Sequence, residues 1–468
     1  MRTTGTGTVA ATVLATCVVA CGGTSSTSTT TTVTSAGSSG DPDGPHRAAV
    51  EAQVAPYLRG EIVSQLVIGI TDGGRHEVYG FSLGAAPKPT GHTLFELGAV
   101  TKTYTGLLLA DAVQRREVEL DTPVAELLPA GVTVPTAGKT PITLRHLVLH
   151  ASGLPRMPPS FETRAATANP YGSYGEDELY QDLLNTRLEH APGEQILYSN
   201  YGSGLLGFAL GRKLGTGYGV AVHDRILVPL GLRETYVTVP AEATARRAPG
   251  TDANLEPVPA WTFTDAMAGA GTLVSSADDQ LAFLDAQLDA AAGGKGALRS
   301  QMRLAQETQL VNAEENEGLG WQVDSAGRYW HNGTTAGYRA FVGFDARGKH
   351  GVVILAATSS TLVEWLGPAL YSILDGQPRA PIELPTAAQL ASYVGHYDAD
   401  GRKLGVVLKG GRLYTEVEGG AHRLAPIGPA GFWDEDLQGV VAFESEAGTV
   451  VRLILHVGDA KFIAPRVP

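Results

Sequence analysis

Lys102 stands three positions after Ala99, in the segment 95–105 that reads FELGAVTKTYT. Residues three apart on a helix are neighbours, so the two side chains would share one face. A lysine amine that is partly withdrawn from water loses its proton more easily than a free one. Such an amine can activate a serine hydroxyl for attack on an acyl group, but position 99 holds a methyl group instead. The pair predicts an acyl-transfer site that lacks its nucleophile.

Two further short motifs follow in the chain, Tyr198-Ser199-Asn200 and His331-Asn332-Gly333. With the Ala-x-x-Lys segment they resemble the Ser-x-x-Lys, Tyr-x-Asn and His-x-Gly motifs of the serine β-lactamases and penicillin-recognising peptidases. The branch is the one that contains class C β-lactamases, D,D-carboxypeptidases and related esterases. The order matches, and the resemblance extends over about residues 63–375. It includes the flanking segments Ile142–Leu147, Ser152–Pro155, Pro192–Gly193, Gly269–Gly271, Ser275–Asp278 and Gly318–Trp321.

The resemblance implies a role for each polar side chain of these motifs. Lys102 and Tyr198 would take the proton of the nucleophile in the family's reaction. Asn200 would hold the lysine and the amide of a substrate by hydrogen bonds. A lysine crowded by Tyr198 in a partly desolvated cleft would be easier to deprotonate.

The same resemblance implies an oxyanion hole, which stabilises the negative charge that develops during acyl transfer. Its two donors would be the backbone N–H groups of Ala99 and Thr334. His331 and Gly333 would lie on the strand edge that faces the substrate. Alanine retains the backbone N–H of position 99, but it cannot form an acyl-enzyme.

Three nearby hydroxyl groups are candidates to replace the missing one. On a helix of period 3.6, Thr101 points roughly 130° away from the direction in which positions 99 and 102 meet, and Thr103 points about 70° away. Thr103 also lies a full turn deeper. Ser199 is the middle residue of its motif, which is variable in the family. We expect none of the three to act as the nucleophile, because a reactive group must first lie within reach of the reacting atom, whatever its pKa.

The motifs leave two functional hypotheses open. The first is an acyl-transfer protein for β-lactam, D-alanyl peptide or ester-like ligands whose catalysis is impaired by Ala99. The second is a non-catalytic binding protein for a peptidoglycan peptide or a protein partner. A third explanation for the alanine is an introduced trapping substitution or a sequence error, although the intact leader is not typical of a trimmed laboratory protein.

Other local patterns support less specific interpretations. Residues 202–207 match G-x-G-x-x-G, but no strand precedes them, so a tightly packed helix is expected instead of a dinucleotide site. His146 and His150 could share a helix face, yet no glutamate or third ligand accompanies them. Residues 171–175 fit an aromatic wall or a plain surface loop. We therefore expect neither a cofactor nor a metal.

The elements that must position the motifs are indicated by hydrophobic patterning and turn residues. The segment 103–119 begins with a dense apolar run and predicts a buried helix whose start faces a cleft. Two strands would flank the turn Asp72-Gly73-Gly74. The ranges expected are helices at Arg47–Gly60, Thr103–Glu119 and Thr361–Asp375 and strands at Val63–Thr71, Arg75–Ser82 and Gly351–Ala356.

A second, smaller domain follows a stretch rich in proline, residues 377–388. Short strand-like runs with Gly-Gly and Asp-Gly turns predict an antiparallel sheet or barrel at residues 389–468. They lie at Leu404–Leu408, Leu413–Val417, Val440–Phe443 and Val450–Val457. The predicted fold class is α+β: a β-lactamase/transpeptidase-like domain at residues 47–376, with an antiparallel sheet flanked by helices and a helical subdomain, then the small β-barrel-like domain.

Composition limits the partners of this chain. It has 468 residues, of which 43% are hydrophobic, so it can bury a sizeable core in two or three domains. Its formal net charge is −13, which repels a polyphosphate backbone. We expect a small-molecule or peptidoglycan-peptide ligand and no nucleic acid. The oligomeric state is left open.

The N-terminal residues resemble an export signal. Arg2 precedes the apolar run Val9–Ala20, which is too short to span a bilayer comfortably. Val18-Val19-Ala20-Cys21 is similar to a bacterial lipoprotein cleavage site, with an ordinary secretory signal as the alternative. We predict a signal at residues 1–21, a lipid anchor on Cys21, a disordered Ser/Thr-rich tether at residues 22–46, and a location in the cell envelope.

Overall fold

The computed structural model describes residues 42–165, 167–311, 316–417 and 420–468. Within these residues the chain forms two compact units, divided between Ile382 and Glu383. The predicted leader, Cys21 and most of the predicted tether lie outside the described residues. No helix in the described part of the chain is long and apolar enough to cross a membrane.

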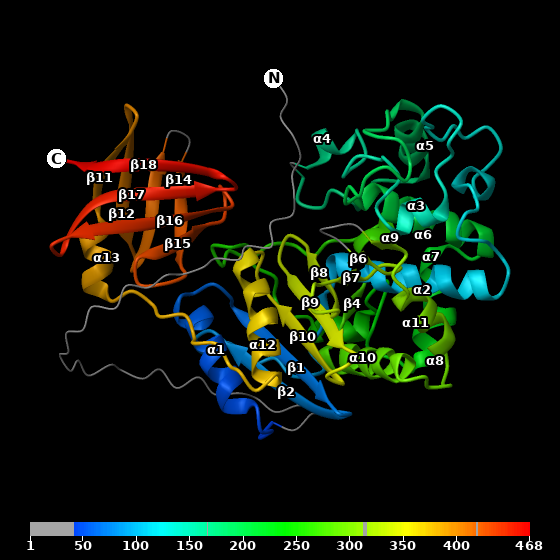
Figure 1. Ribbon diagram of the computed structural model, residues 1–468, viewed down its shortest axis with the longest axis horizontal. Helices are drawn as coiled ribbons and strands as arrows, with labels where there is room; N and C mark the ends of the chain where they lie inside the picture. The colour runs from blue at the N-terminus through cyan, green and yellow to red at the C-terminus, as the bar shows by residue number, and fades with distance from the viewer. Residues whose placement is uncertain (1–41, 166, 312–315, 418–419) are drawn as a thin grey trace. The chain divides into compact units, whose positions relative to one another are not determined.

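An antiparallel sheet organises the larger unit (Figure 1). Its strand order is β2-β1-β10-β9-β8-β7-β6-β5. Strands β1 and β2 pair around Gly73 and Gly74, whose φ angles of 58° and 84° suit the tight hairpin that the sequence predicts. The strands are β1 Gln65–Asp72, β2 Arg75–Ser82, β5 Leu310–Val311, β6 Asn316–Glu317, β7 Gln322–Val323, β8 Tyr329–Thr334, β9 Arg339–Asp345 and β10 His350–Ala356.

Helices cover both faces of this sheet, and two glycines show which helix lies on which face. A Cβ at Gly351 in β10 would meet Leu284 of α10 (Ala277–Ala291), whereas one at Gly343 in β9 would meet Tyr371 of α12 (Leu366–Leu374). Gly343 pairs with Val352, the residue after Gly351, so the two glycines face opposite sides. Helix α1 (Arg47–Arg59) packs beside α12. The sheet is therefore enclosed between α10 on one face and α1 with α12 on the other (Figure 1).

Helix α2 (Thr101–Gln114) is the buried central helix of the unit. It begins two residues before the predicted start and ends five residues before the predicted end. The early end has a local cause: Arg116 adopts a φ of 59°, and the N–H groups of Arg116 and Glu117 bond back to the carbonyls of Val113 and Ala112. This is the Schellman geometry that terminates helices.

Helix α6 (Asn200–Leu214) contains the G-x-G-x-x-G pattern, and its glycines serve packing. A Cβ at Gly207 would lie 2.7 Å from the Cα atom of Gly269 in α9 (Asp265–Gly271), and one at Gly204 would meet Met267. The close approach of α6 and α9 confirms the prediction of a tightly packed helix at this motif.

Short elements complete the larger unit, and two of its strands, β3 and β4, pair separately from the main sheet. They are β3 Phe95–Glu96, η1 Gly98–Val100, η2 Val124–Leu127, α3 Leu144–Val148, α4 Phe161–Arg164, α5 Glu176–Asn185, α7 Tyr218–Val222, η3 His223–Leu227, α8 Val228–Leu230, η4 Ala241–Arg246, β4 Val274–Ser275, α11 Arg299–Gln306 and η5 Thr361–Trp365. The predicted closing helix at 361–375 is thus a 3-10 turn, η5, followed by α12.

The smaller unit is a closed antiparallel barrel that follows helix α13 (Ala387–Tyr393). Its core includes the stacked rings of Tyr393 and Phe443 with Phe432 and Tyr397 around them. The barrel confirms the predicted C-terminal β domain. Its strands are β11 Gly395–Ala399, β12 Arg402–Lys409, β13 Arg412–Val417, β14 Gly420–Pro426, β15 Gly431–Asp434, β16 Gly439–Glu446, β17 Thr449–Val457 and β18 Ala460–Val467.

Candidate functional site

Ala99 lies in the one-turn helix η1, between β3 and the start of α2. Two glycines allow the end of β8 to approach it closely. A Cβ at Gly98, whose φ is 49°, would lie 2.7 Å from the backbone N of Thr334, and a Cβ at Gly333 would lie 2.9 Å from the backbone N of Ala99. The backbone segments 98–99 and 333–334 are therefore in close contact.

Lys102 is almost completely buried, with 3% of its surface exposed. Its Nζ donates to Asn200 Oδ1 at 2.8 Å and to the carbonyl oxygen of Ala270 at 2.9 Å. Burial, followed by the positive charge of Arg156, lowers the pKa of Lys102 well below its ordinary value. A neutral amine has two N–H donors and one lone pair, so both donors are used and the lone pair remains able to accept a proton.

The ring of Tyr198 lies at the centre of a cluster of basic side chains. Lys102 Nζ is 4.9 Å from the ring centroid, the guanidinium carbon of Arg156 is 5.1 Å from it, and the rings of His150 and His331 are at 4.4 and 6.4 Å. Burial raises the pKa of Tyr198, and the charge of Arg156 opposes that shift. The hydroxyl is therefore held in its neutral form at ordinary pH.

His331 is 2% exposed, and its Nδ1–H donates to the carbonyl oxygen of Asn332 at 2.6 Å. Burial, followed by the charge of Lys102, lowers the pKa of His331 to about 3. A neutral imidazole with Nδ1 occupied leaves Nε2 as an acceptor. The side chain therefore enters the cluster without adding a positive charge to it.

His146 and His150, which the sequence places four residues apart, serve separate local purposes. His146 belongs to the capping box of α3 with Thr143. His150 accepts the backbone N–H of Ser199 at Nδ1, and burial lowers its pKa well below the ordinary value. His150 thus contacts both the backbone of Ser199 and the ring of Tyr198.

The three alternative hydroxyl groups are all engaged and buried. Thr101 Oγ1 accepts the N–H of Leu273, and Thr103 Oγ1 donates to the carbonyl of Val100. Ser199 Oγ donates to a carbonyl at 2.7 Å and accepts the N–H that caps α6. Each hydroxyl is thus engaged with backbone groups of the fold.

Sequence reasoning missed three contributors to the site. The carbonyl of Ala270 carries no side-chain signal, since any residue has one. Arg156 lies just after the recognised Ser-Gly-Leu-Pro segment, and Met157 accepts the Nδ2–H of Asn200 at its sulfur, 3.5 Å away. Tyr171, predicted as a wall or a loop, is buried and stacks on Phe263 with ring centroids 4.4 Å apart.

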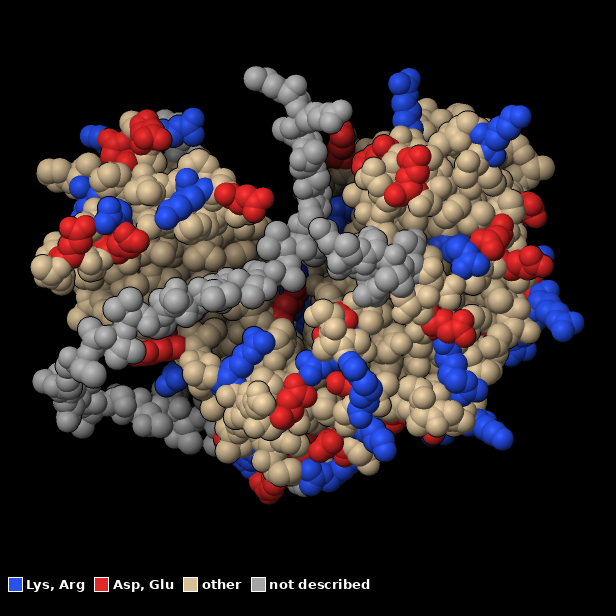
Figure 2. Space-filling view, viewed as in Figure 1, with Lys and Arg blue, Asp and Glu red and all other residues tan. Residues whose placement is uncertain are grey.

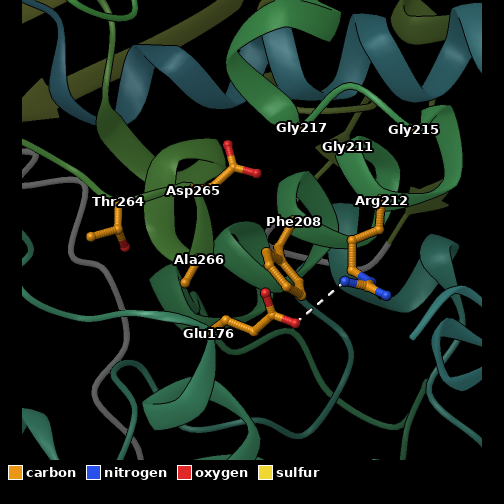
Figure 3. A pocket seen from close by; sticks show the side chains of 9 residues that line it. All are labelled: Glu176, Phe208, Gly211, Arg212, Gly215, Gly217, Thr264, Asp265 and Ala266. Carbon is orange, nitrogen blue, oxygen red and sulfur yellow. Dashed lines mark hydrogen bonds and ion pairs between the residues drawn. The ribbon is translucent and has the colours of Figure 1, made fainter. Parts of the chain in front are cut away.

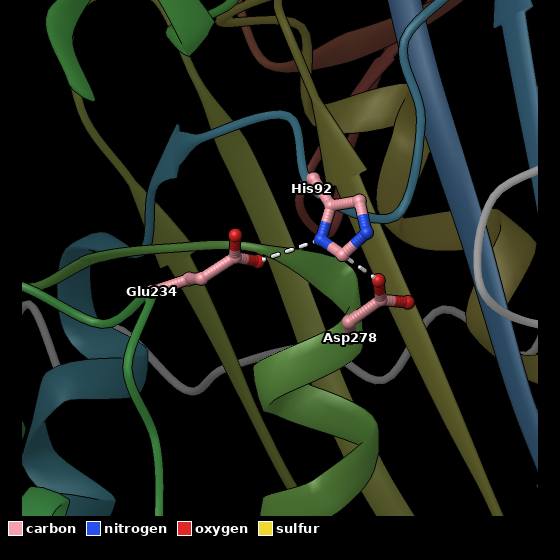
Figure 4. A group of neighbouring side chains, drawn as sticks. All are labelled: His92, Glu234 and Asp278. Carbon is pink, nitrogen blue, oxygen red and sulfur yellow. Dashed lines mark hydrogen bonds and ion pairs between the residues drawn. The ribbon is translucent and has the colours of Figure 1, made fainter. Parts of the chain in front are cut away.

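Other clusters lie apart from these residues. A cavity of about 510 Å³ between α5, α6 and α9 is lined by the Glu176–Arg212 ion pair and the neighbouring Phe208 ring (Figure 3). It is lined by none of the predicted site residues. His92 Nδ1 lies 3.0 Å from Glu234 and 3.2 Å from Asp278 (Figure 4). Hydrogen bonding to Glu234 raises the pKa of His92, and Arg246 also pairs with that carboxylate. The three side chains are explained by this ion-pair network.

Surface charge is mixed where it can be seen. On the face drawn in Figure 2, basic and acidic side chains are interspersed over the larger unit.

Comparison with known proteins places this geometry in context. The sequence model of the β-lactamase family matches residues 47–369. A β-lactamase of Escherichia coli K12 is 27% identical over 288 residues, which are 58% of this chain and 70% of that protein. The D-alanyl-D-alanine-carboxypeptidase/endopeptidase AmpH of the same organism is 29% identical over 201 residues, which are 43% of this chain and 50% of that protein. The match thus spans about half of the carboxypeptidase relative.

A solved structure supports the fold. A class C β-lactamase superposes with a TM-score of 0.62 at 21% identity, covering 73% of this chain and 99% of its own. The likeness confirms the predicted fold class for the larger unit.

Proposed function

Because the chain belongs to the β-lactamase family, we propose that its cleft binds β-lactam, D-alanyl peptide or ester-like compounds and that its acyl transfer is impaired. The Ala-x-x-Lys segment has Ala99 where the Ser-x-x-Lys motif that it resembles has serine. The related carboxypeptidase and β-lactamases support the ligand class. The proposed roles of Lys102, Tyr198 and Asn200 are those expected from the resemblance.

One observation carries this proposal: a buried lysine is retained beside a position that cannot use it as a base. Among the described residues, no carboxylate pairs with Lys102, and its amine instead bonds to Asn200 and Ala270. Burying a polar group without an ionic partner is costly, and an apolar residue of similar size avoids that cost. Retention of the amine therefore favours a continuing use of the cleft in ligand binding.

The missing atom limits what the cleft can do. The amides of Ala99 and Thr334 are available to polarise a carbonyl oxygen, and the lone pair of Lys102 is available to accept a proton. Without a hydroxyl between them, no covalent acyl-enzyme forms at position 99. In serine hydrolases, the oxyanion hole and substrate binding alone accelerate the reaction roughly 10³- to 10⁴-fold over its rate in water.

The test compares the protein with its Ala99→Ser variant, using a labelled penicillin, a chromogenic cephalosporin and an activated ester. We expect no stable adduct in the protein itself. In the variant we expect measurable turnover and a label on the peptide that contains position 99. The double variant Ala99→Ser/Lys102→Met is the matched control, because it has the hydroxyl without the base. A stable adduct on the unaltered protein would contradict impairment, and an inert Ala99→Ser variant would show that the cleft itself has diverged.

The second candidate, a non-catalytic binding protein for a peptidoglycan peptide or a protein partner, is favoured by loss of the hydroxyl together with retention of the lysine. The Lys102→Ala variant tests whether the retained lysine still contributes to ligand binding. If the variant binds a D-alanyl-D-alanine peptide as the unaltered protein does, the retained motif has no binding role. Weaker binding with no turnover in either protein supports this candidate.

We also propose export and lipid attachment at Cys21. The support is the sequence Val18-Val19-Ala20-Cys21 after a short apolar run. Metabolic labelling with a fatty acid in a bacterial host tests it. Fatty-acid label that persists in the Cys21→Ala variant contradicts attachment at Cys21. Recovery of the unaltered protein without label and outside the membrane fraction contradicts it as well.

A further inference from the structure

Arg156 occupies an exposed place at the edge of the site, while its backbone is held firmly. Its carbonyl oxygen accepts the backbone N–H of Asn200 at 2.9 Å and that of Tyr201 at 3.3 Å. Its guanidinium carbon lies 5.1 Å from the centroid of the Tyr198 ring, within the range of a cation–π contact. The side chain is thus oriented by an aromatic face while one edge of it stays open to water.

Arg156 differs from other arginines near the site in having no acidic partner. Arg339 in β9 pairs with Glu364 at 2.9 Å and donates to Thr334 Oγ1. Arg164 pairs with Glu178. Among the described residues, no carboxylate forms an ion pair with Arg156, although the chain carries 48 acidic side chains against 35 basic ones. An open guanidinium is therefore left available beside the Tyr198 ring.

The location of Arg156 relative to Asn200 indicates which part of a ligand it would meet. Asn200 has its Oδ1 bonded to Lys102, while its Nδ2, among the residues that the structure describes, donates only to the sulfur of Met157, a weak acceptor. That N–H is the donor expected to hold a ligand's amide oxygen. Arg156 precedes Met157 in the chain, and its carbonyl oxygen accepts the backbone N–H of Asn200. A ligand whose amide oxygen met Asn200 Nδ2 would therefore carry its acyl side chain into the neighbourhood of Arg156.

We propose that Arg156 is a specificity-determining residue that selects ligands with a carboxylate on the acyl side chain. This inference rests on the proposed acyl-ligand cleft and adds the charge of its preferred ligand. A guanidinium binds a carboxylate through paired N–H···O bonds, which are stronger than neutral hydrogen bonds. Contact with the Tyr198 face limits the movement of the guanidinium and reduces the entropy that binding must remove.

Benzylpenicillin and carbenicillin form a matched pair of probes, because carbenicillin carries one additional carboxylate on the acyl side chain. Calorimetric titration of the Ala99 protein measures both without acylation at position 99. We expect carbenicillin to bind about tenfold more tightly, the scale of one charge-assisted contact. The preference should decrease as salt is raised, since the guanidinium is partly exposed.

Three variants complete the experiment. Arg156→Gln should abolish the preference for carbenicillin over benzylpenicillin, and Arg156→Lys should retain part of that preference. Arg164→Gln is the control, because it removes an arginine that is already paired with Glu178. Thermal unfolding of each variant checks that the fold is intact.

The outcomes separate this inference from the function on which it depends. Equal affinities for the two penicillins, or a preference that persists in Arg156→Gln, would overturn the role of Arg156 while leaving the acyl-ligand cleft in place. Failure of both penicillins to bind would overturn the proposed function and the inference together.

Discussion

Burial of His331 should make the folded state sensitive to acid. Its pKa is about 3 in the folded protein because burial and then Lys102 disfavour the charged ring, whereas an unfolded histidine titrates near 6.5. Below about pH 6.5 the unfolded chain therefore binds a proton that the folded chain does not. The free energy of unfolding falls as pH decreases from about 6.5 to about 3, and is unaffected by this group above that window.

The size of this effect follows from the two pKa values. At pH 5 an unfolded histidine is almost fully protonated and the folded one is almost fully neutral, so linkage predicts a loss of about 2 kcal/mol relative to pH 8. His331→Gln removes the titration, and its amide can still donate toward the carbonyl of Asn332. The loss between pH 8 and pH 5 should therefore be about 2 kcal/mol larger in the unaltered protein than in the variant.

Urea unfolding at the two pH values measures the difference, and each protein serves as its own reference at pH 8. Other groups that titrate in this range, including His150, are present in both proteins, and to first order their contributions cancel. If both proteins lose the same free energy within about 0.5 kcal/mol, His331 does not stay neutral in the folded state, and the reasoning from its burial is refuted.

Three further substitutions test the construction of the site. Gly333→Ala places a Cβ 1.9 Å from the carbonyl oxygen of Leu97, so it should lower the free energy of unfolding by at least the roughly 1–3 kcal/mol of an overpacked contact and weaken penicillin binding. Gly428→Ala is the control, because a Cβ there meets nothing within 4 Å. Equal melting temperatures of the two variants would contradict the close approach. Ser199→Ala removes the cap of α6 and should lower the free energy of unfolding by about 1 kcal/mol. Added to the Ala99→Ser variant, it should not change acylation by the labelled penicillin. Loss of that acylation would make Ser199 part of the chemistry. Burial lowers the pKa of Lys102 in the folded protein, so between pH 8 and pH 10 the unfolded chain binds a proton on this amine that the folded chain does not. The free energy of unfolding should therefore rise from pH 8 to pH 10 relative to that of Lys102→Met. Parallel pH profiles of the two proteins would mean that the amine is charged in the folded protein.

Local patterning was sufficient to predict much of the framework. The hairpin around Gly73 and Gly74 and the strand at 351–356 were predicted because turn preference and β-branched runs are local properties. The end of α2 was predicted wrongly. Arg116 takes a left-handed conformation that its side chain does not indicate, because glycine is the residue usually found there.

The site was only partly accessible to the same reasoning. The pairing of Lys102 with Asn200 follows from matching motifs, and the two atoms do lie 2.8 Å apart. The carbonyl of Ala270 and the position of Arg156 over Tyr198 depend on where α9 and a loop pass. Such contacts join residues far apart in the chain, and no periodicity or spacing encodes them.

The sequence by itself determined which reactive groups the protein possesses. Absence of a hydroxyl at position 99 is a property of the alanine side chain, and no arrangement of the chain can restore it. The tertiary structure decided what the remaining groups are able to do. The pKa of Lys102 depends on burial and on the charge of Arg156. The approach of Gly333 to the backbone of Ala99 depends on strand β8 meeting η1. Both arise only when distant segments are packed together and water is removed from between them.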